Sequence, residues 1–177
     1  DWLISDYIAA NAARCGESPA AIVGADTLSW AEFDRRTAAV AAALADMGGR
    51  PGDRIATVMS NSLAALEVMI GTMRAGMVTV PLNTSLADDT IGSLIADAGA
   101  SVLVATSDHA HRFSGMSAMP RILDGAARSG WLDYRAWRDA APGLVSQPID
   151  PNAPCNIIYS SDRKSTRLNS SHSDRSR

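Results

Sequence analysis

The sequence predicts an α/β protein in which helices alternate with mostly parallel strands, and three observations support this prediction. Segments with apolar residues at helical spacing alternate with short apolar runs of strand length. Glycine, proline and helix-capping residues stand between these segments. The composition is that of an ordinary globular chain, with 46% hydrophobic and 20% charged residues. Strands separated by helices are most simply joined by parallel crossovers, so we expect a parallel sheet.

Two helices and a short strand are expected in the first part of the chain. Residues 2–14 carry apolar side chains at helical spacing, and residues 20–24 form a short strand. The next helix begins after Ser29. Ser29 and Glu32 have the spacing of a capping box, in which each side chain accepts a hydrogen bond from a free backbone amide of the other residue. Gly48 or Gly49, after the apolar face of this helix, supplies its C-terminal stop.

The alternation continues through the middle of the chain and weakens after residue 109. The expected elements, in order, are a strand at 54–60, a helix at 61–75, a strand at 77–82, a helix at 87–99 and a strand at 101–106. A strand at 121–123 and a short helix at 134–140 are weaker predictions. The run "CNIIYSS", residues 155–161, is typical of a buried strand that ends in two hydroxyls, Ser160 and Ser161.

Composition also separates the body of the chain from its last residues. Residues 1–161 contain 11 arginines, no lysine and 17 acidic residues, for a net charge of −6. Residues 162–177 contain five basic and two acidic residues, for a net charge of +3, and lack alanine, glycine, valine and isoleucine. Without aromatic residues or a fold, this tail is a weak candidate for nucleic-acid binding, and we expect no nucleic-acid partner.

Several other classes of site and location find no support in the sequence. No apolar run approaches the roughly 18 residues of a membrane-spanning helix, and no secretory signal is visible. Cys15 and Cys155 are expected to be reduced and packed as small hydrophobic residues, which fits a cytoplasmic protein. The glycine fingerprints of dinucleotide and Walker-type sites are missing. His109 and His111 form a pair without a further ligand nearby, so we expect an exposed loop and no metal site.

The body resembles the N-terminal part of the adenylate-forming superfamily, which contains acyl-CoA synthetases and the adenylation domains of peptide synthetases. The segments that carry the resemblance are "TLSWAEFDRRTAAVAAALADMGGRPGDRIATVMSNS", "EVMIGTMRAGMVTVPLN", "IADAGASVLVAT" and "DPNAPCNIIYSS". The resemblance implies a partial N-terminal domain with an incomplete sheet, spanning residues 1–161. The chain begins with Asp1 and not with Met, so residues before it are expected.

The resemblance also implies an activity and its cofactors. The family forms an acyl-adenylate from a small-molecule carboxylic acid and ATP with Mg²⁺, and then a thioester, usually with coenzyme A, as in fatty acid metabolism. Ser160 and Ser161 match the first two positions of the family's ATP-phosphate loop, whereas Asp162 replaces its first glycine. No catalytic and no metal-binding residue is assigned in this chain. The fragment is expected to bind these cofactors poorly and to be inactive.

Two alternatives stay open beside the acyl-CoA synthetase. The chain could belong to a peptide-synthetase adenylation domain, although Pro81-Leu82-Asn83 favours a CoA ligase. A non-catalytic α/β binding module is the alternative from another class. Residues 162–172 back-translate to a sequence that resembles a common sequencing-library adapter. We therefore expect residues 162–177 to be a disordered, translated artefact.

Overall fold

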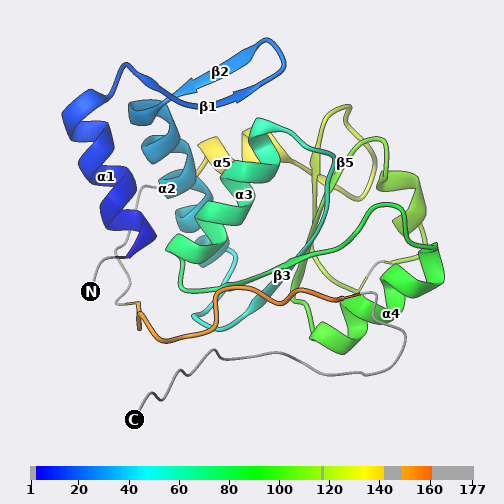
Figure 1. Cartoon of the computed structure of the whole chain (residues 1–177). Coiled ribbons are helices and arrows are strands. Elements are labelled where there is room, and N and C mark those ends of the chain that lie inside the picture. The colour runs from blue at the N-terminus through cyan, green and yellow to red at the C-terminus, as the bar shows by residue number, and fades with distance from the viewer. Residues whose placement is uncertain (1–2, 117, 142–148, 161–177) are drawn as a thin grey trace.

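The computed structural model describes residues 3–116, 118–141 and 149–160. The predicted alternation of helices and strands is present along them (Figure 1). In chain order the elements are α1 (Ile4–Cys15), β1 (Pro19–Val23), β2 (Asp26–Ser29), α2 (Trp30–Asp46), β3 (Arg54–Val58), α3 (Leu63–Arg74), β4 (Val78–Pro81), α4 (Asp88–Ala98), β5 (Val102–Thr106), the 3₁₀ helix η1 (Ala110–Phe113), β6 (Arg121–Asp124), β7 (Leu132–Asp133) and α5 (Tyr134–Asp139).

The main sheet has five strands in the order β4-β3-β5-β6-β7, and every pair in it is parallel. Strand β3 therefore lies between the two strands that follow it in the chain, and the direction of winding reverses between β3 and β5. In open parallel sheets, ligands bind at the carboxyl ends of the strands beside such a reversal. The strands β1 and β2 form a separate antiparallel hairpin that lies outside the sheet (Figure 1).

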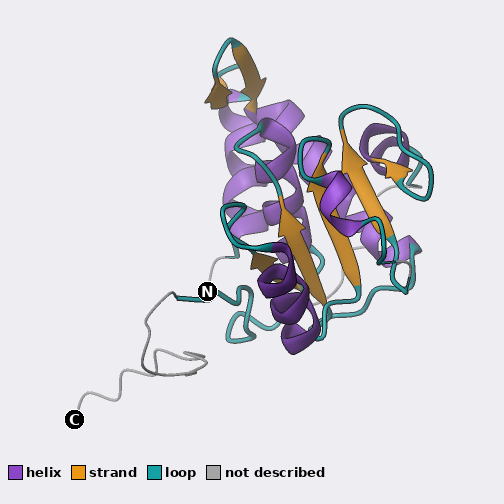
Figure 2. Ribbon diagram, turned by 90° about the vertical axis from the view of Figure 1, so that its right-hand side faces the viewer, coloured by secondary structure: helices purple, strands orange, loops and turns teal. Residues whose placement is uncertain are grey.

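Helices cover both faces of the parallel sheet (Figure 2). Val40 of α2, Val68 of α3 and Tyr134 of α5 belong to one buried cluster together with Ile55 and Val104 of the sheet. The opposite face packs on α4, through a second cluster that contains Ile91 and Ile95 of the helix and Val58 and Leu103 of the sheet. Both faces of β3 and β5 are thus buried, as their continuous apolar runs predict.

The capping residues account for where the helices begin, with one correction. The Ser29 hydroxyl accepts a hydrogen bond from the Glu32 amide at 3.3 Å, and the Ser62 hydroxyl accepts one from the Ala65 amide at 3.1 Å. The reciprocal half of the predicted capping box is not present. The Glu32 carboxylate instead accepts from Arg36 Nε at 2.9 Å, because an ion pair one turn along the helix competes for it.

The described helices include none that is long and apolar enough to cross a membrane. The segment from η1 to α5, where the sequence pattern is weak, holds two elements that were not predicted, η1 and β7. Both are short, with four and two residues, which is too short for a period to be recognised.

Candidate functional site

Residues 155–160 run along the outer edge of β4. The amide of Thr79 donates to the carbonyl of Cys155 at 3.0 Å, and the amide of Ile157 donates to the carbonyl of Thr79 at 2.9 Å. These two bonds make a parallel bridge between Asn156 and Thr79, so the segment extends the sheet beyond its edge strand. In Figure 1 this segment is the orange trace that runs below β3 in the view and reaches α4.

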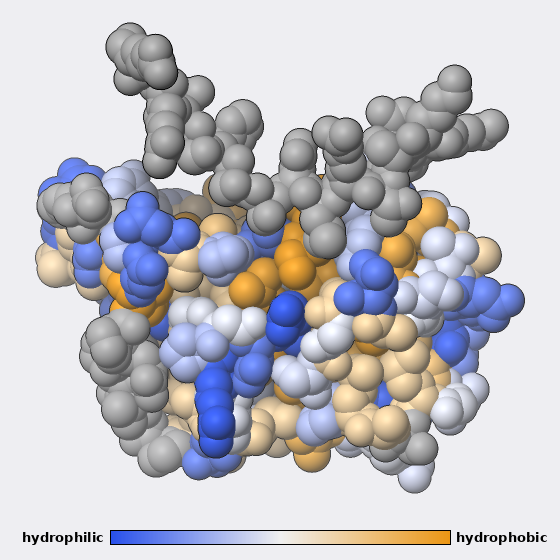
Figure 3. Space-filling view, turned by 90° about the horizontal axis from the view of Figure 1, so that it is seen from below, coloured by the Kyte–Doolittle hydropathy of each residue, from blue (hydrophilic) through white to orange (hydrophobic). Residues whose placement is uncertain are grey.

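The prediction of a buried strand at residues 155–161 is only partly right for the residues that the structure describes, 155–160. The segment makes a single bridge, and none of its side chains is fully buried. Ile157 and Tyr159 pack against the cluster under α4, whereas Ile158 is 74% exposed. The physical reason is its place at the edge, since no described strand pairs with its outer side. The face seen from below carries apolar surface among polar side chains (Figure 3). Cys155 is exposed, so its predicted packing as a buried hydrophobic residue is wrong.

Two side-chain contacts hold this segment in place. The hydroxyl of Thr79, which is buried, lies 3.3 Å from Oδ1 of Asn156 and donates to it. Three residues further on, the Tyr159 hydroxyl donates to Oδ2 of Asp97, on α4, at 2.7 Å. Burial and the hydrogen bond to Asp97 raise the pKa of Tyr159 to about 12, so the phenol stays protonated at neutral pH. The segment is therefore attached both to the sheet and to α4.

Ser160 follows these attachments directly and is exposed. An exposed serine hydroxyl and extended backbone after an edge strand suit an anionic ligand, which takes hydrogen bonds from hydroxyls and amides. One serine is not a complete phosphate site, so we assign no reaction step to the described residues. Ser161, Asp162 and the rest of residues 161–177 lie outside the described part of the chain. The assignment of Ser160 and Ser161 to a phosphate loop stays a prediction.

A second polar cluster lies where the winding of the sheet reverses, and sequence reasoning missed it. The Ser60 hydroxyl, after β3, donates to Oδ2 of Asp108, after β5, at 2.6 Å. The Ser60 amide donates to Oγ1 of Thr106 at 3.1 Å, and Nε2 of His109 lies 3.4 Å from the Ser60 hydroxyl. Hydrogen bonds from Ser60 and Thr106 lower the pKa of Asp108. The sequence shows that Ser60 follows one predicted strand and Asp108 another, but it does not show that the two strands are neighbours.

The other residue pairs considered in the sequence have separate structural roles. His111 is exposed, whereas His109 belongs to the Ser60 cluster. Asp88 stands in the first turn of α4 and pairs with Arg112 Nε at 2.6 Å. Within residues 3–116, 118–141 and 149–160, no three His, Cys, Asp or Glu side chains come together in a way that could hold a metal ion.

A buried ionic network joins three helices on the opposite side of the molecule from α4. Glu67 of α3 is 1% exposed and accepts from Arg138 at 2.8 Å and from the Tyr134 hydroxyl at 2.7 Å, both on α5. Its other oxygen accepts from Arg36 of α2 at 3.0 Å. Because every polar atom of the carboxylate is engaged within the protein, we interpret this network as a structural joint and not as a site.

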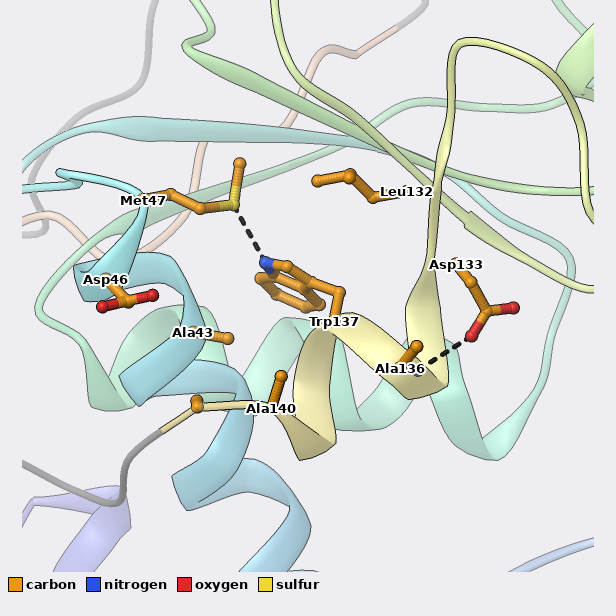
Figure 4. Close-up of a pocket in the computed structure, with 9 residues that line it drawn as sticks. Ala43, Asp46, Met47, Leu132, Asp133, Ala136, Trp137 and Ala140 are labelled. Atoms are coloured by element: carbon orange, nitrogen blue, oxygen red, sulfur yellow. Dashed lines mark hydrogen bonds between the residues drawn. The ribbon is translucent and has the colours of Figure 1, made fainter.

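A pocket of about 210 Å³ lies between the end of α2 and α5 (Figure 4). Its wall is largely apolar, and the indole N–H of Trp137 donates to Sδ of Met47 at 2.9 Å. None of its lining residues belongs to the segment that ends at Ser160 or to the Ser60 cluster. This pocket is therefore separate from both polar candidates.

These features define a class of protein before any comparison is made: a doubly wound α/β domain whose parallel sheet presents hydrogen-bonding groups near its strand ends. Comparison with known proteins narrows this class. The chain belongs to the AMP-binding enzyme family, whose model matches residues 8–161. The adenylate-forming resemblance and the predicted fold class are thus confirmed.

The relatives include both branches that the sequence left open. The chain is 38% identical over 138 residues to a feruloyl-CoA synthase of Amycolatopsis sp, an alignment that covers 78% of this chain and 26% of that protein. It is 37% identical over 161 residues to an L-proline–[L-prolyl-carrier protein] ligase of Streptomyces coelicolor, covering 82% of this chain and 30% of that one. The chain thus spans about a quarter to a third of the length of these relatives.

Solved structures show the same fold at lower identity. A putative long-chain-fatty-acid CoA ligase from Rhodopseudomonas palustris superposes with a TM-score of 0.84 at 21% identity, over 91% of this chain and 42% of that one. The anthranilate CoA ligase AuaEII, solved with anthranoyl-AMP, superposes with a TM-score of 0.83 at 17% identity, over 90% and 32% of the two chains. The arrangement of helices around the sheet is therefore that of adenylate-forming enzymes.

Proposed function

We propose that this chain is the N-terminal part of an ATP-dependent, carboxylate-activating ligase that makes a CoA thioester. The observation that carries the proposal is the family match over residues 8–161, together with 38% identity to a feruloyl-CoA synthase. Ser160 adds to it, because an exposed hydroxyl stands where the family resemblance requires the phosphate loop to begin. The match ends at residue 161, which supports a domain at 1–161 and a foreign segment at 162–177.

The proposed reaction has two steps. A carboxylate oxygen of the substrate attacks the α-phosphorus of Mg²⁺-bound ATP and displaces pyrophosphate, which yields an acyl-adenylate. The sulfur of coenzyme A then attacks the acyl carbon, loses its proton and displaces AMP. Most groups that would carry out these steps are expected outside residues 1–161, so we propose that the 177-residue chain alone is inactive. A small-molecule carboxylic acid is the substrate class, and a cytoplasmic location stays a prediction.

A second candidate function is transfer of the acyl group to a carrier protein instead of free coenzyme A. The 37% identity to a prolyl-carrier-protein ligase favours it specifically. Pro81-Leu82-Asn83 favours the CoA ligase, and these residues connect β4 to the loop before α4. The two candidates share the adenylation step and differ in the thiol that accepts the acyl group.

The experiment that tests the proposal uses the full-length protein that contains residues 1–161. It measures ATP–pyrophosphate exchange with a panel of aryl, fatty and amino acids, and then thioester formation with coenzyme A. Exchange that depends on a carboxylic acid, followed by an acyl-CoA product, is the expected result. Exchange without any acyl-CoA, in the presence of a competent carrier protein that becomes acylated, would support the second candidate instead.

A further inference from the structure

Asp97 occupies an unfavourable position on α4. It stands in the last turn of the helix, where free carbonyls give the helix its negative end, and this turn contains no basic residue. The residue is exposed, so no apolar contact explains its presence there. A carboxylate at this place is tolerated when a partner compensates for the repulsion. The partner is the Tyr159 hydroxyl, which donates to Oδ2 at 2.7 Å.

In the hydrogen bond between Tyr159 and Asp97, the phenol is the donor and the carboxylate is the acceptor. Burial of the phenol and its hydrogen bond to the carboxylate raise the pKa of Tyr159 to about 12, so at neutral pH the hydroxyl keeps its proton and donates it. The ring is partly buried against the cluster under α4, together with Ile157. Tyr159 is thus fixed by its ring and by its hydroxyl. The hydroxyl has a longer contact of 3.5 Å to the carbonyl of Leu94, so only its short hydrogen bond depends on Asp97.

The segment is attached to the rest of the protein by two sets of contacts, one before and one after the exposed Ile158. The earlier one is the bridge to Thr79, which uses two backbone bonds and the side chain of Asn156. The later one is the contact between Tyr159 and Asp97. Beyond Tyr159, Ser160 is exposed and belongs to no strand. The direction in which the backbone leaves the sheet at Ser160 is therefore set at Tyr159.

We infer that Asp97 is a positioning residue for nucleotide binding, acting through Tyr159 to fix Ser160 and the backbone that leads into the phosphate loop. This inference rests on the proposed function. When a ligand has to order a backbone segment as it binds, the lost conformational entropy reduces the binding free energy, and the affinity is weaker. Loss of the Asp97 contact should accordingly raise KM for ATP while it leaves kcat nearly unchanged.

The test compares variants of the full-length ligase. In Asp97→Ala and Tyr159→Phe, KM for ATP should rise roughly 3- to 10-fold, the range that corresponds to one ordinary hydrogen bond, with kcat changed less than about 2-fold. The double variant should show no further rise beyond that of Tyr159→Phe, because the loss of the hydroxyl already removes the contact with Asp97. Asp97→Asn keeps an acceptor oxygen and should restore most of the affinity. Asp46→Ala is the matched control, since Asp46 is also an exposed acid in the last turn of a helix.

A second measurement separates this inference from the proposed function. Backbone amide exchange at residues 157–160 should be faster in Asp97→Ala than in the wild type and unchanged in Asp46→Ala. If these amides exchange at the wild-type rate, or if KM for ATP does not change in an active enzyme, the inference is wrong. If the amides become labile but the wild-type protein shows no ATP–pyrophosphate exchange, Asp97 positions the segment and the proposed function is wrong.

Discussion

The substitution Glu67→Gln tests whether the buried ionic network holds α2, α3 and α5 together. Glu67 is 1% exposed, and its carboxylate accepts hydrogen bonds from two arginines and from the Tyr134 hydroxyl. Glutamine preserves the volume but removes the charge and turns an amide group towards donors. Loss of one partner from a buried ion pair costs about 3–5 kcal/mol of folding free energy.

The structure places the expected cost near the lower end of that range. Arg138 keeps two hydrogen bonds to Asp139, at 2.8 and 2.9 Å, and Arg36 keeps its contact with Glu32. Neither guanidinium is left without a partner when Glu67 loses its charge. We therefore expect the free energy of unfolding to fall by about 3 kcal/mol.

Urea unfolding of the purified chain, followed by tryptophan fluorescence, measures this change. Glu32→Gln is the control, because Glu32 pairs with the same Arg36 but its side chain is 40% exposed, and exposed pairs contribute about 0–1 kcal/mol. If Glu67→Gln is no more destabilising than Glu32→Gln, the network does not join the helices and the reasoning fails. A midpoint shift at an unchanged slope would identify the effect as a loss of stability.

Three other predictions concern packing, pH and activity. Gly71→Ala should lower the free energy of unfolding by about 1–3 kcal/mol in the same urea assay, because the added Cβ would lie 2.5 Å from Val40 of α2. Gly92→Ala on α4 is the control: its added Cβ would meet nothing within 4 Å, so this variant should be neutral or stabilising. The lowered pKa of Asp108 means that its stabilising effect is complete above its ordinary pKa of 3.8 and disappears as the pH falls through the lowered value. The stability difference between wild type and Asp108→Asn, below about 1 kcal/mol for so exposed a group, should vanish on acidification, and a constant difference would contradict the assignment. The 177-residue chain should show no carboxylate-dependent ATP–pyrophosphate exchange, and robust exchange by it would refute its proposed inactivity.

Local patterns in the sequence were sufficient to predict most helices and strands. Ser29 and Ser62 cap α2 and α3 because the preference of serine for this position depends only on nearby backbone amides. The apolar runs of β3 and β5 predict burial on both faces, which the parallel sheet confirms. The role of Glu32 was predicted wrongly, since a capping box and an ion pair to Arg36 use the same carboxylate and local spacing does not decide between them.

Contacts between residues far apart in the chain could not be predicted in the same way. Ser60 and Asp108 meet because β3 and β5 are neighbours in the sheet, although 48 positions separate them. Glu67 and Arg138 meet only because α5 packs against α2 and β6, which brings the Arg138 side chain within reach of α3. The segment 155–160 was expected to be buried on the strength of its apolar residues. Of its apolar residues, only Ile157 and Tyr159 are partly buried, and Ile158 is exposed because the segment lies at the sheet edge, a position that the sequence pattern does not contain.

ATP–pyrophosphate exchange by the full-length protein containing residues 1–161 tests the central claim most directly. The account predicts exchange that depends on a carboxylic acid and on ATP, with an acyl-CoA product when coenzyme A is added. A folded full-length protein that shows no exchange with any of the aryl, fatty or amino acids supplied would contradict it.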